Sequence, residues 1–232
     1  MARSPRLLVA GLPHMLSQRA QHGQVMVRDD DDRRLLLRLL REGAVEHEVA
    51  LHAYAVLDTR FDLVATPQQA VGLSRLMQSV ARRHASAFNR RYQRSGGLWE
   101  GRFRATAVEP ESWLLPCMVY VEQLTPVETS REGESIDTCI WSSRAGHCGQ
   151  AADPLLADPL AYWRLGNTPF DREAAYRKLC EQALTLSQRG QIEAALRSGG
   201  VLGSPGFVER LRQTKGLPAR PRPRGRPKKV LA

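Results

Sequence analysis

Residues 56–67 read VLDTRFDLVATP, and the structure that this stretch adopts decides the fold. It begins and ends with apolar residues, which is typical of a buried strand. Three charged residues, Asp58, Arg60 and Asp62, occupy alternate positions, and alternate positions of a strand point to the same face. The stretch therefore predicts one buried strand whose polar face is either exposed to water or part of a functional site.

The sequence around this stretch predicts further strands and helices in alternation. Apolar runs predict strands at 5–11 and 50–57, and residues 98–108 predict a loop that leads into a strand. Helical periodicity is found over 33–49, 68–94, 111–123, 170–184 and 188–199. This order is typical of an α+β fold, in which a small antiparallel sheet carries helices on one face.

The charge of the chain is concentrated at its C-terminal end. The 232 residues carry a formal net charge of +10, and eight Lys or Arg residues but no acid occur from Arg212 onward. We expect a domain over 1–128, a linker and helical extension over 129–211, and a disordered basic tail over 212–232. Such a tail indicates an anionic polymer, most often nucleic acid, as partner; the alternative is a solvated tail that only aids solubility.

The expected location of the protein and the expected redox state of its cysteines rest on patterns that the sequence does not contain. Its apolar runs are too short to span a membrane, and residues 1–10 have no apolar core typical of a signal peptide, so we expect a cytoplasmic protein without a membrane partner. None of the four cysteines has CxxC spacing, which predicts free thiols rather than a metal cluster or a redox pair.

The segment 68–94 is the candidate nucleic-acid surface of the domain. It is rich in arginine, and no acid occurs between Pro67 and Leu98. Aromatic side chains stack on bases while cations follow the phosphates, which favours binding to a single strand over a merely solvated helix. The candidate DNA-binding residues here are Arg82, Arg83, Arg90, Arg91, Tyr92, Arg94, Arg102 and Arg104.

The tail contains a second candidate DNA-binding motif. Residues 221–229 read PRPRGRPKK, which looks like an AT-hook. The narrow, extended Arg-Gly-Arg-Pro core can lie in the minor groove of A·T-rich DNA, whereas a plain basic tail would bind phosphates without preference. The residues concerned are Arg222, Arg224, Arg226, Lys228 and Lys229.

Several stretches together resemble one family, the single-tyrosine HUH transposases, and within it the REP-associated tyrosine transposases. In chain order they are RLLVAGLPHMLSQRAQ, RDDDDRR, LHAYAVL, GLSRLMQSVARRHASAFNRRY, GGLWEGRFRATAVE, WSS and PRGRPKK. The resemblance implies a ferredoxin-like catalytic domain that acts on single-stranded DNA hairpins, among them repeat palindromes, in the bacterial nucleoid. It also implies a His-hydrophobic-His motif that binds a divalent metal, and a tyrosine that forms a 5′-phosphotyrosine intermediate.

The catalytic positions depart from the family pattern. Arg60-Phe61-Asp62 stands where the family has His-hydrophobic-His, so both histidine ligands are absent. Tyr120 falls at the nucleophile position, and Gln123 lies one turn later, where the family can add a polar metal contact. Residues 124–128 also differ from the family's Asn-Pro-Val-Arg-Ala. The resemblance thus implies a transposase-like protein with a degenerate metal motif.

The charged positions of the opening stretch allow three interpretations. Arg60 and Asp62 can form an ion pair that only solvates the strand. Asp58 and Asp62 can hold Mg²⁺ or Mn²⁺ through oxygen ligands, although Arg60 between them opposes a cation. Arg60 can instead bind a phosphate in bidentate fashion. Tyr120, for its part, can be an ordinary half-buried packing residue.

The sequence therefore leaves three functional hypotheses. The first is a DNA-binding protein of the transposase type that is catalytically impaired and needs no cofactor. The second is an active transposase with an altered carboxylate metal site, which would need Mg²⁺ or Mn²⁺. The third is a DNA-binding regulator that retains only the fold. Whether the chain is an enzyme stays open, and family members act as monomers or as homodimers.

Overall fold

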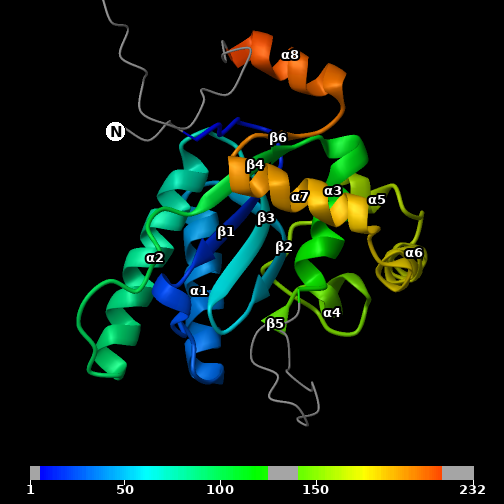
Figure 1. Cartoon of the computed structure of the whole chain (residues 1–232). Coiled ribbons are helices and arrows are strands. Elements are labelled where there is room, and N and C mark those ends of the chain that lie inside the picture. The colour runs from blue at the N-terminus through cyan, green and yellow to red at the C-terminus, as the bar shows by residue number, and fades with distance from the viewer. Residues whose placement is uncertain (1–5, 125–140, 216–232) are drawn as a thin grey trace, which may run out of the picture.

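The computed structural model of this chain describes residues 6–124 and 141–215 (Figure 1). The N-terminal half has the order β1-α1-β2-β3-α2-β4-α3, with a short 3₁₀ turn between β1 and α1. The bounds are β1 His14–Arg19, α1 Asp30–Glu46, β2 Val49–Val56, β3 Arg60–Pro67, α2 Gly72–Arg91, β4 Arg104–Val108 and α3 Pro110–Glu122.

The C-terminal extension adds short strands and further helices. Their bounds are β5 Trp141–Ser142, α4 Arg144–His147, α5 Leu160–Trp163, α6 Pro169–Gln182, α7 Leu186–Ser198, β6 Val201–Leu202 and α8 Pro205–Lys215. In the described part of the chain, none of the helices combines the length and the hydropathy that crossing a membrane requires.

The strands form one sheet in the order β5-β2-β3-β1-β4-β6. The four central strands pair antiparallel, and their β1-α1-β2-β3-α2-β4 connection is that of a ferredoxin-like fold, so the predicted α+β class is confirmed. The extension lengthens the sheet at both edges, because β5 pairs antiparallel with β2 and β6 pairs parallel with β4.

Helices cover both faces of this sheet, as Figure 1 shows, whereas the sequence predicted helices on one face. Helices α1 and α2 pack on the face that carries Phe61 and Leu63. Helices α3, α5, α6 and α7 pack on the opposite face, which carries Met15 and Val64. The central strands are therefore apolar on both sides, and each side needs a cover.

Helix α1 begins where the acidic cluster predicts. The Asp29 side chain accepts a hydrogen bond of 3.1 Å from the backbone N–H of Asp32, and three acids occupy the first turn. Such acids complement the positive end of the helix dipole. The ends of helices α2, α3, α6 and α7 also lie within one to four residues of their predicted bounds.

Several local predictions are wrong. Residues 56–67 are not one strand: β2 ends at Val56, the chain turns, and the N–H of Leu57 donates 2.9 Å to the carbonyl of Arg60 at the start of β3. Residues 6–11 are not a strand either. The apolar character of this segment serves packing, because Val9 contacts Ala107 and Leu211. The first strand begins after Pro13.

The C-terminal predictions differ in two places. Trp141 and Ser142 form an edge strand within the region predicted as a linker and helical extension. Helix α8 continues to Lys215, so the first residues of the predicted disordered tail are helical. The AT-hook-like motif and the predicted domain boundary at 128 lie outside the described residues.

Candidate functional site

Arg60 and Asp62 lie side by side on β3, on the face that α3 covers. The Asp62 side chain is 2% exposed, and the Arg60 Nε lies 3.1 Å from Asp62 Oδ2. Burial raises the pKa of Asp62 above its ordinary value, although Arg60, Ser17 and Arg19 act in the opposite direction. The ion pair predicted as one alternative is therefore present, with its carboxylate in a poorly solvated position.

Asp58 is not part of this group. It lies in the β2–β3 turn, where its carboxylate accepts a hydrogen bond of 2.7 Å from Arg33 of α1. Strand alternation cannot place Asp58 beside Asp62, because the turn reverses the chain between them. The predicted carboxylate pair for Mg²⁺ or Mn²⁺ is thus not assembled.

The residues at this position do not fit a divalent metal. A guanidinium group stands beside the carboxylate, and both charges already satisfy each other. Among the described residues, no three His, Cys, Asp or Glu side chains are grouped to hold a metal ion. A site built from one carboxylate and one arginine lacks the donors that either a hard or a borderline divalent ion requires.

Tyr120 lies on α3 near this pair and is 7% exposed. Its hydroxyl donates a hydrogen bond of 3.2 Å to Glu193 Oε1 of α7. Burial raises the pKa of Tyr120 to about 12, the carboxylates of Glu193 and Asp62 act in the same direction, and Arg60 opposes them. The structure thus brings together the three residues that the resemblance placed at the catalytic centre.

Gln123, which the resemblance implied as a possible polar metal contact, bonds to the C-terminal extension. Its Nε2 donates 2.5 Å to the carbonyl of Cys180, and its Oε1 accepts 3.2 Å from Arg189. Both partners belong to the extension, so this amide holds the end of α3 against α6 and α7.

Glu122 is a buried residue that the sequence analysis missed. Its Oε1 accepts hydrogen bonds from Ser143 at 2.5 Å and from the His147 ring at 2.6 Å, and its Oε2 accepts one from Tyr176 at 2.8 Å. The side chain is fully buried. Two segments of the extension, α4 with its N-cap and α6, are therefore held to the helix that carries Tyr120 through one carboxylate.

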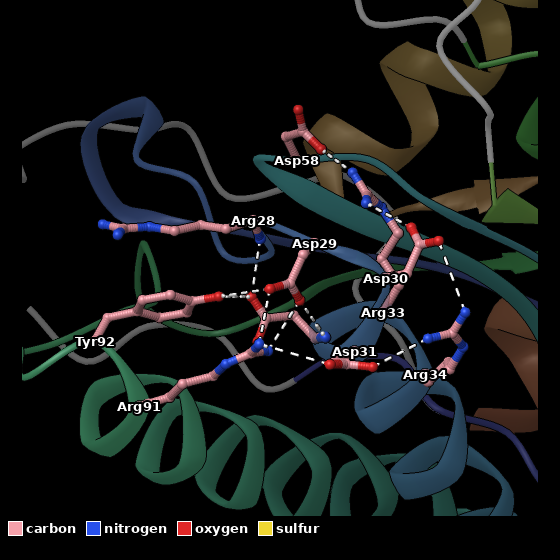
Figure 2. Close-up of polar contacts among 10 residues, drawn as sticks. Arg28, Asp29, Asp30, Asp31, Arg33, Arg34, Asp58, Arg91 and Tyr92 are labelled. Atoms are coloured by element: carbon pink, nitrogen blue, oxygen red, sulfur yellow. Dashed lines mark hydrogen bonds and ion pairs between the residues drawn. The ribbon is translucent and has the colours of Figure 1, made fainter.

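The arginines of α2 meet acids from α1, as Figure 2 shows for Arg91. Arg91 contacts Asp29 and Asp32 at 2.8 Å each, and the Tyr92 hydroxyl donates 2.8 Å to Asp32. Arg28 stacks over the Tyr92 ring, at 4.3 Å from its centroid. The acids absent from 68–97 are thus supplied by the neighbouring helix.

Two more predicted DNA-binding residues have intramolecular partners. Arg83 donates 2.6 Å to Glu42 of α1, and Arg94 donates to Gln24. Their assignment to DNA stays a prediction, but each would have to exchange a protein partner for a phosphate.

The remaining predicted arginines are exposed and, in the described part of the chain, form no ion pair. These are Arg82, Arg90, Arg102 and Arg104. The last two line a small cavity together with Arg19 of β1, which the sequence analysis missed. The alternation of Ser17 and Arg19 could have indicated that face, had β1 been placed correctly.

Comparison with known proteins supports the fold. No family model and no curated protein matches this sequence. The solved structure of a REP-associated tyrosine transposase bound to a REP hairpin is similar, with a TM-score of 0.50 and 13% identity, covering 69% of this chain and 93% of that one. A Deinococcus radiodurans R1 protein assigned as a transposase has 26% identity and a TM-score of 0.35, over 47% of this chain and 87% of that one. The first likeness, at this low identity, shows that this chain has a transposase-like fold.

Proposed function

We propose that this protein binds DNA with a transposase-like fold and does not perform the tyrosine attack on a phosphodiester. One observation carries the proposal: the Tyr120 hydroxyl is buried against Glu193, beside an Arg60–Asp62 ion pair at the place where the family has its metal motif. Tyr120 thus lies next to the position of the metal motif, but neither a lowered phenol pKa nor a bound cation would promote its attack.

The phenol of Tyr120 is poorly prepared for attack. With a pKa of about 12, roughly one molecule in 10⁵ carries a phenolate at pH 7. Glu193 accepts the hydroxyl proton in a hydrogen bond, but its carboxylate also raises the free energy of a neighbouring phenolate.

The phosphate would also lack a strong electrophile. Asp62 neutralises most of the field of Arg60, and the donor set does not fit a divalent ion. Loss of such stabilisation typically costs several kcal/mol, which lowers the rate by orders of magnitude.

DNA as partner is supported by charge and by fold. Exposed arginines without acidic partners occur on α2 and at the start of β4, and the similar transposase structure contains a REP hairpin. The basic segment 216–232 adds further cations. Such charges bind phosphates by releasing counterions, so we expect the affinity to fall steeply with salt.

A suicide hairpin substrate, read on a denaturing gel, tests the proposal. We expect no covalent adduct from the wild type with Mg²⁺, Mn²⁺ or EDTA, while gel shift shows binding. The comparison variants are Tyr120→Phe and the double variant Arg60→His with Asp62→His.

A wild-type adduct that disappears in Tyr120→Phe would overturn the loss of catalysis. An adduct formed only by the double histidine variant would support the proposal and show that the metal ligands are the missing part. Absence of any hairpin binding would overturn DNA as partner.

A further inference from the structure

We infer that Arg19, Arg102 and Arg104 form a subsite for one DNA backbone phosphate, so that this face binds DNA without a divalent metal. The inference rests on the proposed function, because it assigns the group that the sheet face beside Tyr120 would hold. It replaces Arg60, which the sequence suggested as a phosphate clamp and which the structure pairs with Asp62.

The three arginines come from neighbouring parts of the sheet. Ser17 of β1 lies opposite Asp62 of β3 on one side and opposite Arg104 of β4 on the other. Arg19, two residues later, points to the same face as Ser17. Arg102 precedes β4, and all three arginines line one cavity with Ser17, Gln18 and Glu100.

The cavity suits one oxygen atom of a phosphate. Its volume is about 20 Å³, which is enough for an atom the size of a water molecule and too small for a whole phosphate. The remaining oxygens would stay at the mouth, where the exposed guanidinium groups of Arg102 and Arg104 can reach them. Guanidinium groups match phosphate oxygens in geometry as well as in charge.

Ser17 lines the cavity beside Asp62. It is 2% exposed, and a hydrogen bond from its side chain helps to lower the pKa of the Asp62 carboxyl. The Arg60 guanidinium contacts the same carboxylate at 3.1 Å. The buried acid next to the cavity thus already has two partners, which leaves Arg19, Arg102 and Arg104 available to a phosphate.

The loop that carries Arg102 is held in place before any ligand arrives. The N–H of Glu100 donates 2.9 Å to the carbonyl of Arg19, and Gln18 Nε2 donates 3.2 Å to the carbonyl of Gly101. Gly101 has a φ of 81°, a conformation that other residues rarely adopt. A preorganised loop loses little conformational entropy on binding.

The local charge favours an anion. The cavity contains three arginines and one carboxylate, that of Glu100, while Asp62 is already paired with Arg60. A divalent cation would be repelled by this set, whereas a phosphate would be attracted. The same groups thus explain why a metal does not fit and what binds in its place.

Fluorescence anisotropy with a short DNA hairpin that carries a single-stranded flank tests the inference, with EDTA present throughout. We expect Arg19→Gln and Arg104→Gln each to reduce the slope of log affinity against log salt by about 1. The double variant that combines Arg19→Gln with Arg104→Gln should bind the hairpin about tenfold or more weakly at moderate salt. Arg41→Gln removes an exposed arginine of α1 that lies outside this cavity and outside the candidate DNA-binding residues, and it serves as the matched control.

A methylphosphonate scan of the flank locates the contact. One neutral linkage should weaken binding to the wild type and leave binding to the double variant unchanged, because the charge it removes is no longer recognised. Unchanged melting temperatures of the variants would show that folding is intact.

Equal affinities of the wild type, Arg41→Gln and the double variant would overturn the subsite and leave DNA binding in place. Loss of wild-type binding in EDTA, restored by Mg²⁺, would overturn the metal-free character. A wild type that binds no hairpin under any condition would overturn the proposed function and the subsite with it.

Discussion

Two ion pairs of this molecule contain the same residue types and behave in opposite ways. Asp29 contacts Arg91 at 2.8 Å where α1 meets α2, and Asp62 contacts Arg60 at 3.1 Å on the sheet. The pKa of Asp29 is lowered, first by the N–H of Asp32 and then by Arg91, whereas burial raises the pKa of Asp62. A neighbouring arginine therefore does not decide how a carboxylate ionises; access to water and to N–H donors does.

The two pairs also differ in what surrounds them. Around Asp29 the charges of α1 and α2 satisfy each other, as Figure 2 shows, and the arrangement joins two helices. The Asp62 side chain is 2% exposed and lies near the buried Tyr120, whereas the Asp29 side chain is 45% exposed. Poorly solvated titratable groups concentrate at functional sites, which is why we place the site on the sheet and not on α2.

The largest change in stability that we expect comes from His14, whose pKa is shifted by burial and not by a charged neighbour. Its Nδ1–H donates 2.8 Å to the carbonyl of Leu12, and its Nε2 accepts 3.2 Å from the N–H of Val9. Burial lowers its pKa from 6.5 to about 4. Its contribution to stability, on the order of 3 kcal/mol, should be complete above pH 6.5 and lost as the pH falls towards 4.

Urea denaturation between pH 7 and pH 4 measures this loss. His14→Gln should flatten the decline, while the exposed His22→Asn should keep the wild-type slope. Equal slopes for His14→Gln and the wild type would show that burial does not set the ionisation of this histidine.

The next largest effect should come from Asp32, the buried carboxylate of the α1–α2 contact. It accepts hydrogen bonds from Arg91, Tyr92 and the N–H of Arg28. Asp32→Ala removes the acceptor of the Arg28 N–H and leaves Arg91 and Tyr92 with hydrogen bonds to Asp29 alone, so it should lower the free energy of unfolding by about 1–3 kcal/mol. Thermal unfolding of this variant is compared with that of Asp31→Ala, whose side chain is 71% exposed and should matter little. If both variants were equally stable, the contact would not join the helices.

The smallest change in stability should come from substituting Asp62 or Asp29. The sign of the change distinguishes these two carboxylates. The raised pKa of Asp62 means that the folded protein retains this proton after the unfolded chain has lost it, so stability falls as the pH rises above the unfolded value of 3.8. Asp62→Asn removes this decline and should be at least as stable as the wild type at pH 7.

Asp29→Asn is the matched control for the sign. The lowered pKa of Asp29 contributes stability that is present above 3.8 and lost as the pH falls below it. This variant should therefore be less stable than the wild type at pH 7 and approach it in acid. The same sign for both substitutions, read from urea midpoints at pH 3 and pH 7, would contradict the contrast between the two pairs.

Much of the fold could be predicted because it is encoded locally. The apolar stripe and the acidic cap of α1 and the glycine-bounded α2 each lie within one segment, so periodicity finds them. The β2–β3 turn was missed because Asp58, which is a residue type common in turns, was counted among three charges at alternate positions of a single strand. The first strand was misplaced because the apolar run before it packs without pairing.

The site could be predicted only in part. Resemblance named Arg60, Asp62 and Tyr120, and the structure places them together. It could not name Glu193, which lies 73 residues from Tyr120, or Ser17 and Arg19 on a strand that was misplaced. Residues that act through distant partners leave no periodic signal.

The sequence alone determined the α+β order, the excess of positive charge and the absence of histidine at the metal motif, because these are properties of composition and local pattern. Only the tertiary structure decided which arginines are neutralised. Arg91 meets Asp29 across 62 residues, while Arg19, Arg102 and Arg104 converge on a cavity with a single carboxylate. The physical reason is that an arginine's availability depends on the charges that the topology places beside it.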